Sequence, residues 1–295
     1  PRGTYRPLPA SQRITALAFA SPSVWLCGGS AGGLALLSCA QYSIGSSDGA
    51  TAETFIEHAH GSQPVTSILV EDPPPGAAAP VFTCGRNGVV NEYELRVDDS
   101  AAASLGLLRS WKCPSASILE SLLPTDDGLV ALAFVQNEAL LWHVIRREEI
   151  SRWATRGYRH PKAVAVERES REPSYLLAYA IGTSVHTMRS VAATGGSSSD
   201  DTRQHSVRSL MPDFHGREIL CIASVPGVSG RNAFVTGGED NAVKIISCSS
   251  GSTNINTAAA EPLTEPLRVE TTLDGHPAAV RAVALSKCSS TASSS

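Results

Sequence analysis

The clearest pattern in the chain is a repeated alternation of apolar and polar residues on either side of a tight turn. In residues 234–246, a short β-rich run ends at Gly237-Gly238, a polar turn follows, and a second run alternates apolar and polar side chains. Alternation with a period of two indicates a half-buried β-strand, and glycine supplies the positive φ that a tight turn requires. The segment therefore predicts a β-hairpin.

The same pattern recurs upstream, closely in residues 24–37 and 81–93 and more loosely in residues 129–142 and 176–188. The hairpins end at aligned apolar residues spaced roughly 46 to 58 positions apart, namely Leu37, Tyr93, Trp142, Met188 and Ile246. We expect a further strand before each hairpin, at 14–19, 65–70, 118–123, 163–166 and 219–223. One more strand, at 280–285, has no hairpin after it. The repetition predicts an all-β repeat protein.

Composition narrows the class of protein without changing this prediction. Hydrophobic residues make up 42% of the 295 residues and charged residues 18%, which is typical of globular chains. The net charge of -4 argues against a dedicated nucleic-acid binder, because affinity for phosphate requires clustered lysine and arginine. Seven cysteines without a C-x-x-C pair indicate free thiols in a reducing compartment, so we expect a cytoplasmic protein that contacts no membrane.

Three further features resemble WD repeats, whose pattern is a Gly-His pair, an aspartate in the central turn and a closing Trp-Asp. The pairs are Gly275-His276 and, in reverse order, His60-Gly61 and His215-Gly216. The turn residues are Asp240 and Asn87, and the closing pairs are Trp142-His143 and Tyr93-Glu94. Leu37, Met188 and Ile246 replace the tryptophan outright.

The resemblance implies an all-β WD-repeat β-propeller of about five blades and a partial one. The blades are expected near 14–50, 60–97, 110–146, 150–190 and 213–250, with a partial blade at 272–286, all within one domain over residues 1–288. Residues 289–295 are expected to form a disordered serine-rich tail. Because the chain does not begin with methionine and its last strand lacks partners, we expect it to be part of a larger protein.

The resemblance also assigns structural roles to the histidines. We expect His215 to hydrogen-bond Asp240, with Thr236 nearby, and His60 to hydrogen-bond Asn87. A satisfied buried polar network of this kind makes a sheet rigid. A ligand-binding histidine is the weaker alternative. The chain is then a non-catalytic scaffold, with no cofactor, no metal and no small-molecule substrate.

A narrower resemblance involves residues 214–219, 235–240 and 275–282. This series is similar to the C-terminal part of the large WD-repeat subunits that partner a tRNA ribose 2′-O-methyltransferase. That resemblance implies that the chain positions tRNA for a catalytic partner that modifies the wobble ribose of the anticodon. A scaffold that binds other proteins and no RNA remains the alternative.

Two groups of charged residues are candidates for contacts with a partner or RNA. The basic stretch contains Arg146, Arg147, Arg152, Arg156, Arg159 and Lys162, interleaved with Trp153 and Tyr158. Such a stretch offers both charge and stacking faces, although an outer strand with a solvated face is the simpler interpretation. Arg217 and Glu218 follow the His-Gly corner, where they either contact a partner or form a local ion pair.

A competing hypothesis is a serine hydrolase. Residues 28–32 fit G-x-S-x-G, with Ser30 at the position of the nucleophile. In that fold, several strands and an oxyanion loop precede the nucleophile, whereas only 29 residues precede Ser30 here. The same turn recurs at Gly85 and Gly237 without the serine. Ser30 is therefore interpreted as a turn residue.

Overall fold

The computed structural model describes residues 8–9, 12–21, 24–38, 51–73, 77–97, 103–125, 128–155, 163–168, 175–189, 207–225, 232–248 and 267–283. Within these ranges every regular element is a β-strand, as the period-two alternation predicts. No helix in the described ranges is long and apolar enough to cross a membrane. The tail predicted at 289–295 lies outside the described residues.

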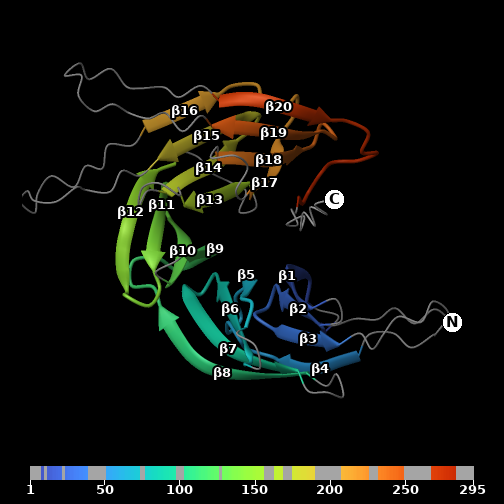
Figure 1. Cartoon of the computed structure of the whole chain (residues 1–295), viewed down its shortest axis with the longest axis vertical. Helices are drawn as coiled ribbons and strands as arrows, with labels where there is room; N and C mark the ends of the chain where they lie inside the picture. Colours follow the sequence, from blue (N-terminus) through green and yellow to red (C-terminus); the bar gives the residue numbers. More distant parts are fainter. Residues whose placement is uncertain are drawn as a thin grey trace, which may run out of the picture. The chain divides into compact units, whose positions relative to one another are not determined.

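The strands form five antiparallel sheets of four strands each, and within each sheet the strands follow one another in chain order (Figure 1). Sheet A contains β1 (Ile14–Ser21), β2 (Val24–Gly29), β3 (Leu34–Ser38) and β4 (Thr51–Ile56). Sheet B contains β5 (Val65–Val70), β6 (Ala79–Gly85), β7 (Val89–Val97) and β8 (Ala103–Lys112). Sheet C contains β9 (Ile118–Thr125), β10 (Gly128–Val135), β11 (Glu138–His143) and β12 (Glu148–Ala154). Sheet D contains β13 (Val164–Arg168), β14 (Tyr175–Ile181), β15 (Ser184–Arg189) and β16 (Val207–Met211). Sheet E contains β17 (Ile219–Val225), β18 (Asn232–Gly238), β19 (Val243–Cys248) and β20 (Leu267–Leu273).

The predicted hairpins are confirmed as the central pair of strands in every sheet, β2–β3, β6–β7, β10–β11, β14–β15 and β18–β19. The strand expected before each hairpin is also present. The expected extents of the repeating units differ from those of the sheets, because they omit the fourth strand. Residues 110–112 and 150–154, for example, were expected to begin new repeating units. They are instead the last residues of sheets B and C.

The fourth strands have a weak sequence signal because they lie at the outer edge of their sheets. Six of the seven residues of β20 are exposed, and β8 has a run of five exposed residues over 106–110. A strand that is solvated on both faces needs no alternation of apolar and polar residues. The same exposure explains why hydrophobic periodicity did not reveal β8 and β20.

A second expectation, a strand at 280–285, is not met in its described part. Residues 280–283 have no strand pairing, although Val280 is buried against sheet E. The partial blade expected at 272–286 is therefore not formed within the described residues, and Thr272 and Leu273 belong to β20.

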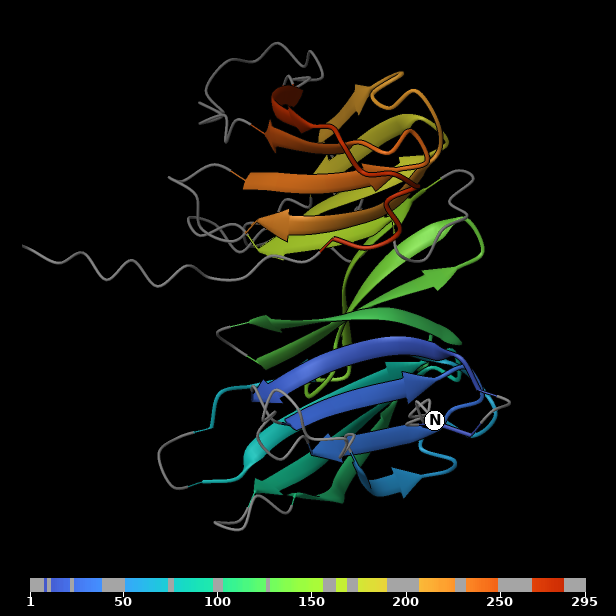
Figure 2. The same ribbon diagram turned by 90° about the vertical axis from the view of Figure 1, so that its right-hand side faces the viewer.

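The chain divides into two compact units, Pro1–Ala154 and Thr155–Ser295. In the first unit β5 contacts β1 and β9, so that the inner strands of sheets A, B and C lie side by side (Figures 1 and 2). Leu26 and Leu36 of sheet A pack against Val81 and Tyr93 of sheet B. A second cluster, which includes Val90, Trp111, Leu129 and Trp142, fills the space between sheets B and C.

The inner strands of the first unit are also joined by hydrogen bonds. The hydroxyl of Thr15 donates to the Val65 carbonyl at 2.7 Å, and the hydroxyl of Thr66 donates to the Leu119 carbonyl at 2.6 Å. Gly28 lies under Val65 so closely that a Cβ there would be 2.6 Å from the Val65 Cβ. Glycine therefore allows the sheets to approach at their inner edge.

In the second unit β17 contacts β13 and β14, and sheets D and E enclose a core that includes Leu176, Phe214, Ile219, Phe234 and Ile246. The amide of Ile219 donates to the Gly182 carbonyl at 2.9 Å. This bond attaches the first strand of sheet E to the central turn of sheet D.

In the first unit, sheet A has one face that neither sheet B nor sheet C covers. Leu17 and Phe19 on β1 are 49% and 60% exposed, and the Phe19 ring meets Trp25 edge-on. The matching residues of sheet B, Ile68 and Val70, pack into the core against sheet A. The part of this face formed by Leu17 and Phe19 is therefore apolar in the same way as the equivalent part of sheet B.

The thiols of Cys27, Cys84, Cys113 and Cys221 are buried and are not in disulfide bonds. Burial raises the pKa of Cys27 to about 11 and that of Cys84 to about 12. These thiols therefore stay protonated near neutral pH, where a thiolate would be needed for reaction.

The close approach at Gly28 leads to a stability prediction. Gly28→Ala should destabilise the first unit by about 1–3 kcal/mol, because the new methyl group overlaps Val65 in a packed core. The matched control is Gly106→Ala in β8, where nothing lies within 4 Å of the new Cβ, and the change should stay within about 0.5 kcal/mol. Urea unfolding measures both, and equal effects would contradict the inter-sheet contact.

Candidate functional site

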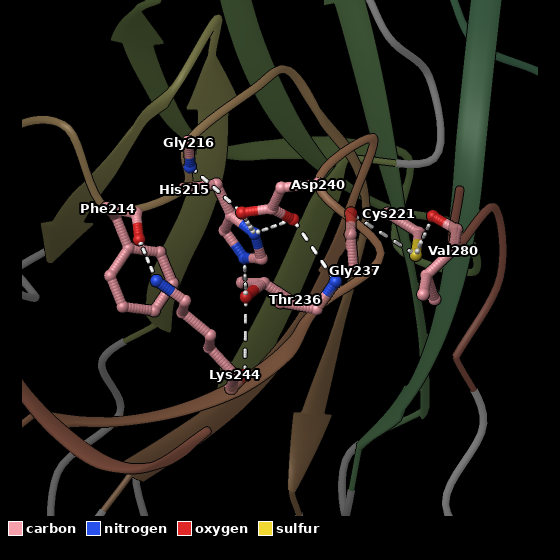
Figure 3. Close-up of polar contacts among 10 residues, drawn as sticks. Phe214, His215, Gly216, Cys221, Thr236, Gly237, Asp240, Lys244 and Val280 are labelled. Carbon is pink, nitrogen blue, oxygen red and sulfur yellow. Dashed lines mark hydrogen bonds and ion pairs between the residues drawn. The ribbon is translucent and has the colours of Figure 1, made fainter. Parts of the chain in front are cut away.

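The most organised polar cluster in the second unit is centred on His215, which precedes β17 and is 1% exposed (Figure 3). Its Nδ1 atom lies 2.8 Å from Asp240 Oδ1, and its Nε2 atom lies 2.8 Å from the hydroxyl of Thr236. Asp240 also accepts the amides of Gly216 and Ala242, at 2.9 and 3.2 Å. The start of the sheet is thus tied to β18 and to the β18–β19 turn, and these are the partners expected from the sequence.

An equivalent cluster in sheet B surrounds His60, which is fully buried before β5. Its Nδ1 atom donates to Asn87 Oδ1 at 3.1 Å, and its Nε2 atom lies 2.8 Å from the Thr83 hydroxyl. Asn87 was the partner expected from the sequence, whereas Thr83 was not identified. Thr83 has the same place on β6 that Thr236 has on β18. We refer to each set of histidine, threonine and turn residue as a corner.

The corner in sheet B extends into a network that crosses the sheet. Asn91 donates to the Ala59 carbonyl at 2.6 Å and accepts the hydroxyl of Ser110 at 2.6 Å. Its amide also donates to the Tyr93 hydroxyl at 3.4 Å. The network links the turn before β5 to β7 and to the outer strand β8, and it gives the buried Tyr93 hydroxyl a polar partner.

Burial determines the charge state of both histidines. It lowers the pKa of His60 and of His215, although hydrogen bonds to Asn87 and Asp240 oppose the change. Burial alone would raise the pKa of Asp240, but the hydrogen bonds from His215, Gly216 and Ala242 lower it overall. A neutral His215 therefore donates from Nδ1 to an ionised Asp240 and accepts the Thr236 hydroxyl at Nε2. Protonation of the ring would release that hydroxyl to the Lys244 carbonyl, 3.2 Å away.

The corner in sheet E has the residue types of a catalytic triad, but not the accessibility of one. A triad requires a hydroxyl that a substrate can reach, whereas Thr236 is 0% exposed and lies in the middle of β18. Lys244 donates to the Phe214 carbonyl at 2.5 Å and lies over the Phe214 ring. The geometry therefore supports a structural role for this cluster, in which it holds the segment before β17 against β18 and β19.

Two other sheets of the first unit modify the corner. In sheet A, a Cβ on Gly29 would be 2.1 Å from Gln12 Oε1, just as one on Gly85 would approach His60 Nδ1. Gln12 therefore occupies the place of the histidine, and its Oε1 accepts the Gly33 amide at 3.3 Å. In sheet C, the Nε1 atom of Trp142 is buried and has no hydrogen-bond partner among the described residues.

An interaction that sequence analysis missed joins sheets B and C. Arg86, in the β6–β7 turn, lies 3.5 Å from Glu120 on β9, and the Glu120 side chain is 6% exposed. Burial raises the pKa of Glu120 to about 7, while the charge of Arg86 acts to lower it. The two residues are 34 positions apart in the chain, so only the tertiary arrangement reveals the pair.

The basic stretch is less free to bind a partner than its sequence suggests. Arg152 is held by Glu149 and Glu138, both at 2.8 Å, and Arg146 is paired with Glu148 at 2.8 Å. Arg147 is exposed in the turn before β12, and Trp153 is buried in that strand. The outer-strand interpretation therefore fits the described part. Arg156, Tyr158, Arg159 and Lys162 lie outside the described residues.

Arg217 and Glu218 are placed beside the corner of sheet E. Arg217 is exposed, and within the described ranges its side chain has no hydrogen bond or ion pair. Glu218 is half-buried, and its carbonyl accepts the Glu239 amide at 2.9 Å. Arg217 is therefore the more available of the two for a partner.

The serine hydrolase hypothesis gains no support from the geometry. The Ser30 hydroxyl accepts the Arg13 amide at 3.0 Å, as a turn serine does. In the part of the chain that the structure describes, no three His, Cys, Asp or Glu side chains gather closely enough to hold a metal ion.

Comparison with known proteins adds no assignment to this geometry. No protein-family model matches the chain, and no curated protein matches it significantly.

The corner in sheet E can be tested by removing its charge. Asp240→Asn should lower the free energy of unfolding by about 1–3 kcal/mol, because three hydrogen bonds lose a charged acceptor. The neighbouring exposed carboxylate gives the control Glu239→Gln, which should cost about 0.5 kcal/mol or less. Chemical denaturation compares the two, and an Asp240→Asn effect no larger than the control would rule out the assigned role.

Glu120 predicts a pH-dependent effect. Because its pKa in the folded state lies above the ordinary value of 4.5, its contribution to stability is complete below pH 4.5 and is lost as the pH rises through about 7. Glu120→Gln should therefore be more favourable, relative to wild type, at pH 8 than at pH 5. Urea midpoints at both pH values measure this, with the exposed Glu57→Gln as a control for loss of charge. The same effect of Glu120→Gln at both pH values would contradict the raised pKa of Glu120 in the folded protein.

Proposed function

We propose that this chain is a non-catalytic WD-repeat β-propeller scaffold, in which the five four-stranded sheets are consecutive blades. The observation that carries the proposal is the recurrence of one buried corner in sheets B and E, made by His60, Thr83 and Asn87 in one and by His215, Thr236 and Asp240 in the other. The chain-order strands of every sheet and the adjacent inner strands within each unit agree with it.

We propose a non-catalytic role because of where the polar side chains of the sheets lie. The polar groups best suited to chemistry are buried and already hydrogen-bonded inside the sheets. What each unit offers to solvent is turns and edges that carry adaptable charged side chains, and such elements usually bind partners. A scaffold for other macromolecules in the cytoplasm fits both features.

For the partner we propose tRNA and a tRNA ribose 2′-O-methyltransferase, on the resemblance in residues 214–219, 235–240 and 275–282. The exposed Arg217 lies within this series, and Arg147 adds a second exposed cation. The scaffold would hold tRNA while the catalytic partner modifies the wobble ribose. A scaffold that binds only proteins is the alternative outcome.

The tagged chain, purified from cells, provides the test. Mass spectrometry and RNA sequencing of the bound fraction should recover a methyltransferase together with tRNA. Recovery of proteins without tRNA or methyltransferase would support the protein-only scaffold. Labelling of Ser30 by a serine-reactive phosphonate would contradict the non-catalytic assignment and restore the hydrolase hypothesis.

Arg217 gives a sharper prediction for the same assay. Arg217→Ala should reduce recovery of the bound partner by about threefold or more, because it removes an exposed cation beside the corner without removing a contact inside the protein. Arg268→Ala, at an exposed position on the edge strand β20, is the control and should leave recovery unchanged. Equal recovery with both variants would exclude Arg217 from the interface.

A further inference from the structure

Val280 is attached to sheet E by two hydrogen bonds and by a packed side chain. Its amide donates to the Gly238 carbonyl at 3.0 Å, and its carbonyl accepts the Cys221 thiol at 3.7 Å (Figure 3). Its side chain covers Gly237 so closely that a Cβ on that glycine would be 2.4 Å from Val280 Cγ1. The residue is 7% exposed, so this is a packed position.

The same unit shows what such a position does. Ile219 donates its amide to Gly182 in the central turn of sheet D, as Val280 donates to Gly238 beside the central turn of sheet E. Ile219 then begins β17, the first strand of the next sheet. In the first unit Val65 covers Gly28 in the way that Val280 covers Gly237, and Val65 begins β5. Val280 thus has the place of a residue that begins a sheet.

The rest of this first strand lacks its partner. Residues 280–283 have no strand pairing among the described residues, and Arg281 and Ala282 are exposed. His276 lies four positions before Val280, as His215 lies four positions before Ile219. In contrast to the buried His215, His276 is exposed and has no hydrogen bond within the described ranges.

We propose that residues 276–283 form a docking site for a β-hairpin from another polypeptide segment, which adds to them as the second and third strands of a sheet. Addition of a strand to an open edge is an established mode of recognition, in which backbone hydrogen bonds supply affinity and side-chain pockets supply specificity. Here specificity for the hairpin comes from His276, which needs hydrogen-bond partners, and from Val280, which needs a glycine opposite it.

The existing sheets determine the chemistry of the hairpin. The first residues of β1, β5 and β17 all face a glycine on the second strand, in the pairs Ile14–Gly29, Val65–Gly85 and Ile219–Gly238. Glycine is needed because the corner side chain lies over it, and a Cβ on Gly238 would be 2.7 Å from His215 Nδ1. The partner hairpin should therefore place glycine opposite Val280. It should also present threonine before that glycine and aspartate or asparagine in its turn, where His276 can bond both.

The occupant is not one of the five hairpins that the described residues form, in their folded state. All five hairpins are flanked on both sides by strands of their own sheets. A second copy of the chain would consequently have to open a sheet to supply one. A hairpin from a different segment could bind without the opening of any of these sheets.

A closed synthetic hairpin provides the test on the full chain. The probe is a peptide of residues 232–248 with Asn232→Cys, closed by a disulfide to Cys248, since positions 232 and 248 face each other across the pair. Closure is needed because an isolated hairpin is marginally stable in water. The peptide contains Thr236, Gly238 and Asp240, which are the residues required of the partner. A second closed peptide with Gly238→Val is the matched control, and cross-strand NMR contacts establish that both are hairpins before binding is measured.

We expect the first peptide to bind saturably with 1:1 stoichiometry by fluorescence anisotropy, and to slow hydrogen exchange in residues 280–283. The Gly238→Val peptide should not bind. In the chain, His276→Ala should weaken binding about threefold to tenfold, the loss of one to two hydrogen bonds. His58→Ala, at another exposed histidine, should not weaken it.

Three results would overturn the proposal. These are no saturable binding of the first peptide, equal binding of the Gly238→Val peptide, or slowed exchange only outside residues 276–283. A concentration-dependent dimer that excludes the peptide would assign the edge to a second copy, which also overturns it. The inference extends the scaffold function but does not rest on its partner, so a failed peptide assay and a failed recovery of tRNA are separate outcomes.

Discussion

The fold depends on a buried histidine that ties the start of a sheet to its central turn. In sheets B and E the ring has no more than 1% exposure, and both nitrogens are hydrogen-bonded. The ring links the segment that enters the sheet to the hairpin at its centre, and Asn91 in sheet B and Lys244 in sheet E reinforce it by bonding carbonyls of the same segment. An unsatisfied polar group at this depth would cost about 1–3 kcal/mol, so the histidine, the threonine and the turn residue must be present together or be replaced together.

The sheets of the first unit show how such replacement occurs. Sheet A substitutes Gln12 for the histidine and Cys27 for the threonine, so that an amide oxygen now accepts the turn amide of Gly33. In sheet C, the buried indole nitrogen of Trp142 has no hydrogen-bond partner among the described residues. The glycine beside the corner is present in sheets A, B and E, because a side chain there would overlap the corner residue. The glycine is therefore present in all three of these sheets, whereas the histidine and the threonine are each replaced in sheet A.

The alternation of apolar and polar residues predicted the hairpins and the strands before them, but not the most exposed outer strands. The hairpin β18–β19 was evident from its alternation and its glycines, whereas β20, with six exposed residues, has no period to detect. The pair of His215 and Asp240 followed from a family resemblance. Thr83 and Gln12 did not, because neither lies in a recognisable motif and their roles depend on register. The pair of Arg86 and Glu120 required knowledge of which sheets are adjacent, which local sequence does not contain.

The polar side chains of the corners in sheets B and E are hydrogen-bonded to one another, whereas some at the edge of sheet E, such as His276, have no partner among the described residues. This account requires the histidine, threonine and turn residue of a corner to stabilise the sheet together. A double-mutant cycle of His215→Ala and Asp240→Ala, followed by urea unfolding of the full chain, tests this most directly. A coupling energy of about 1–3 kcal/mol is predicted, because each residue loses its main partner when the other is removed. Additive effects, with a coupling energy near zero, would contradict the account.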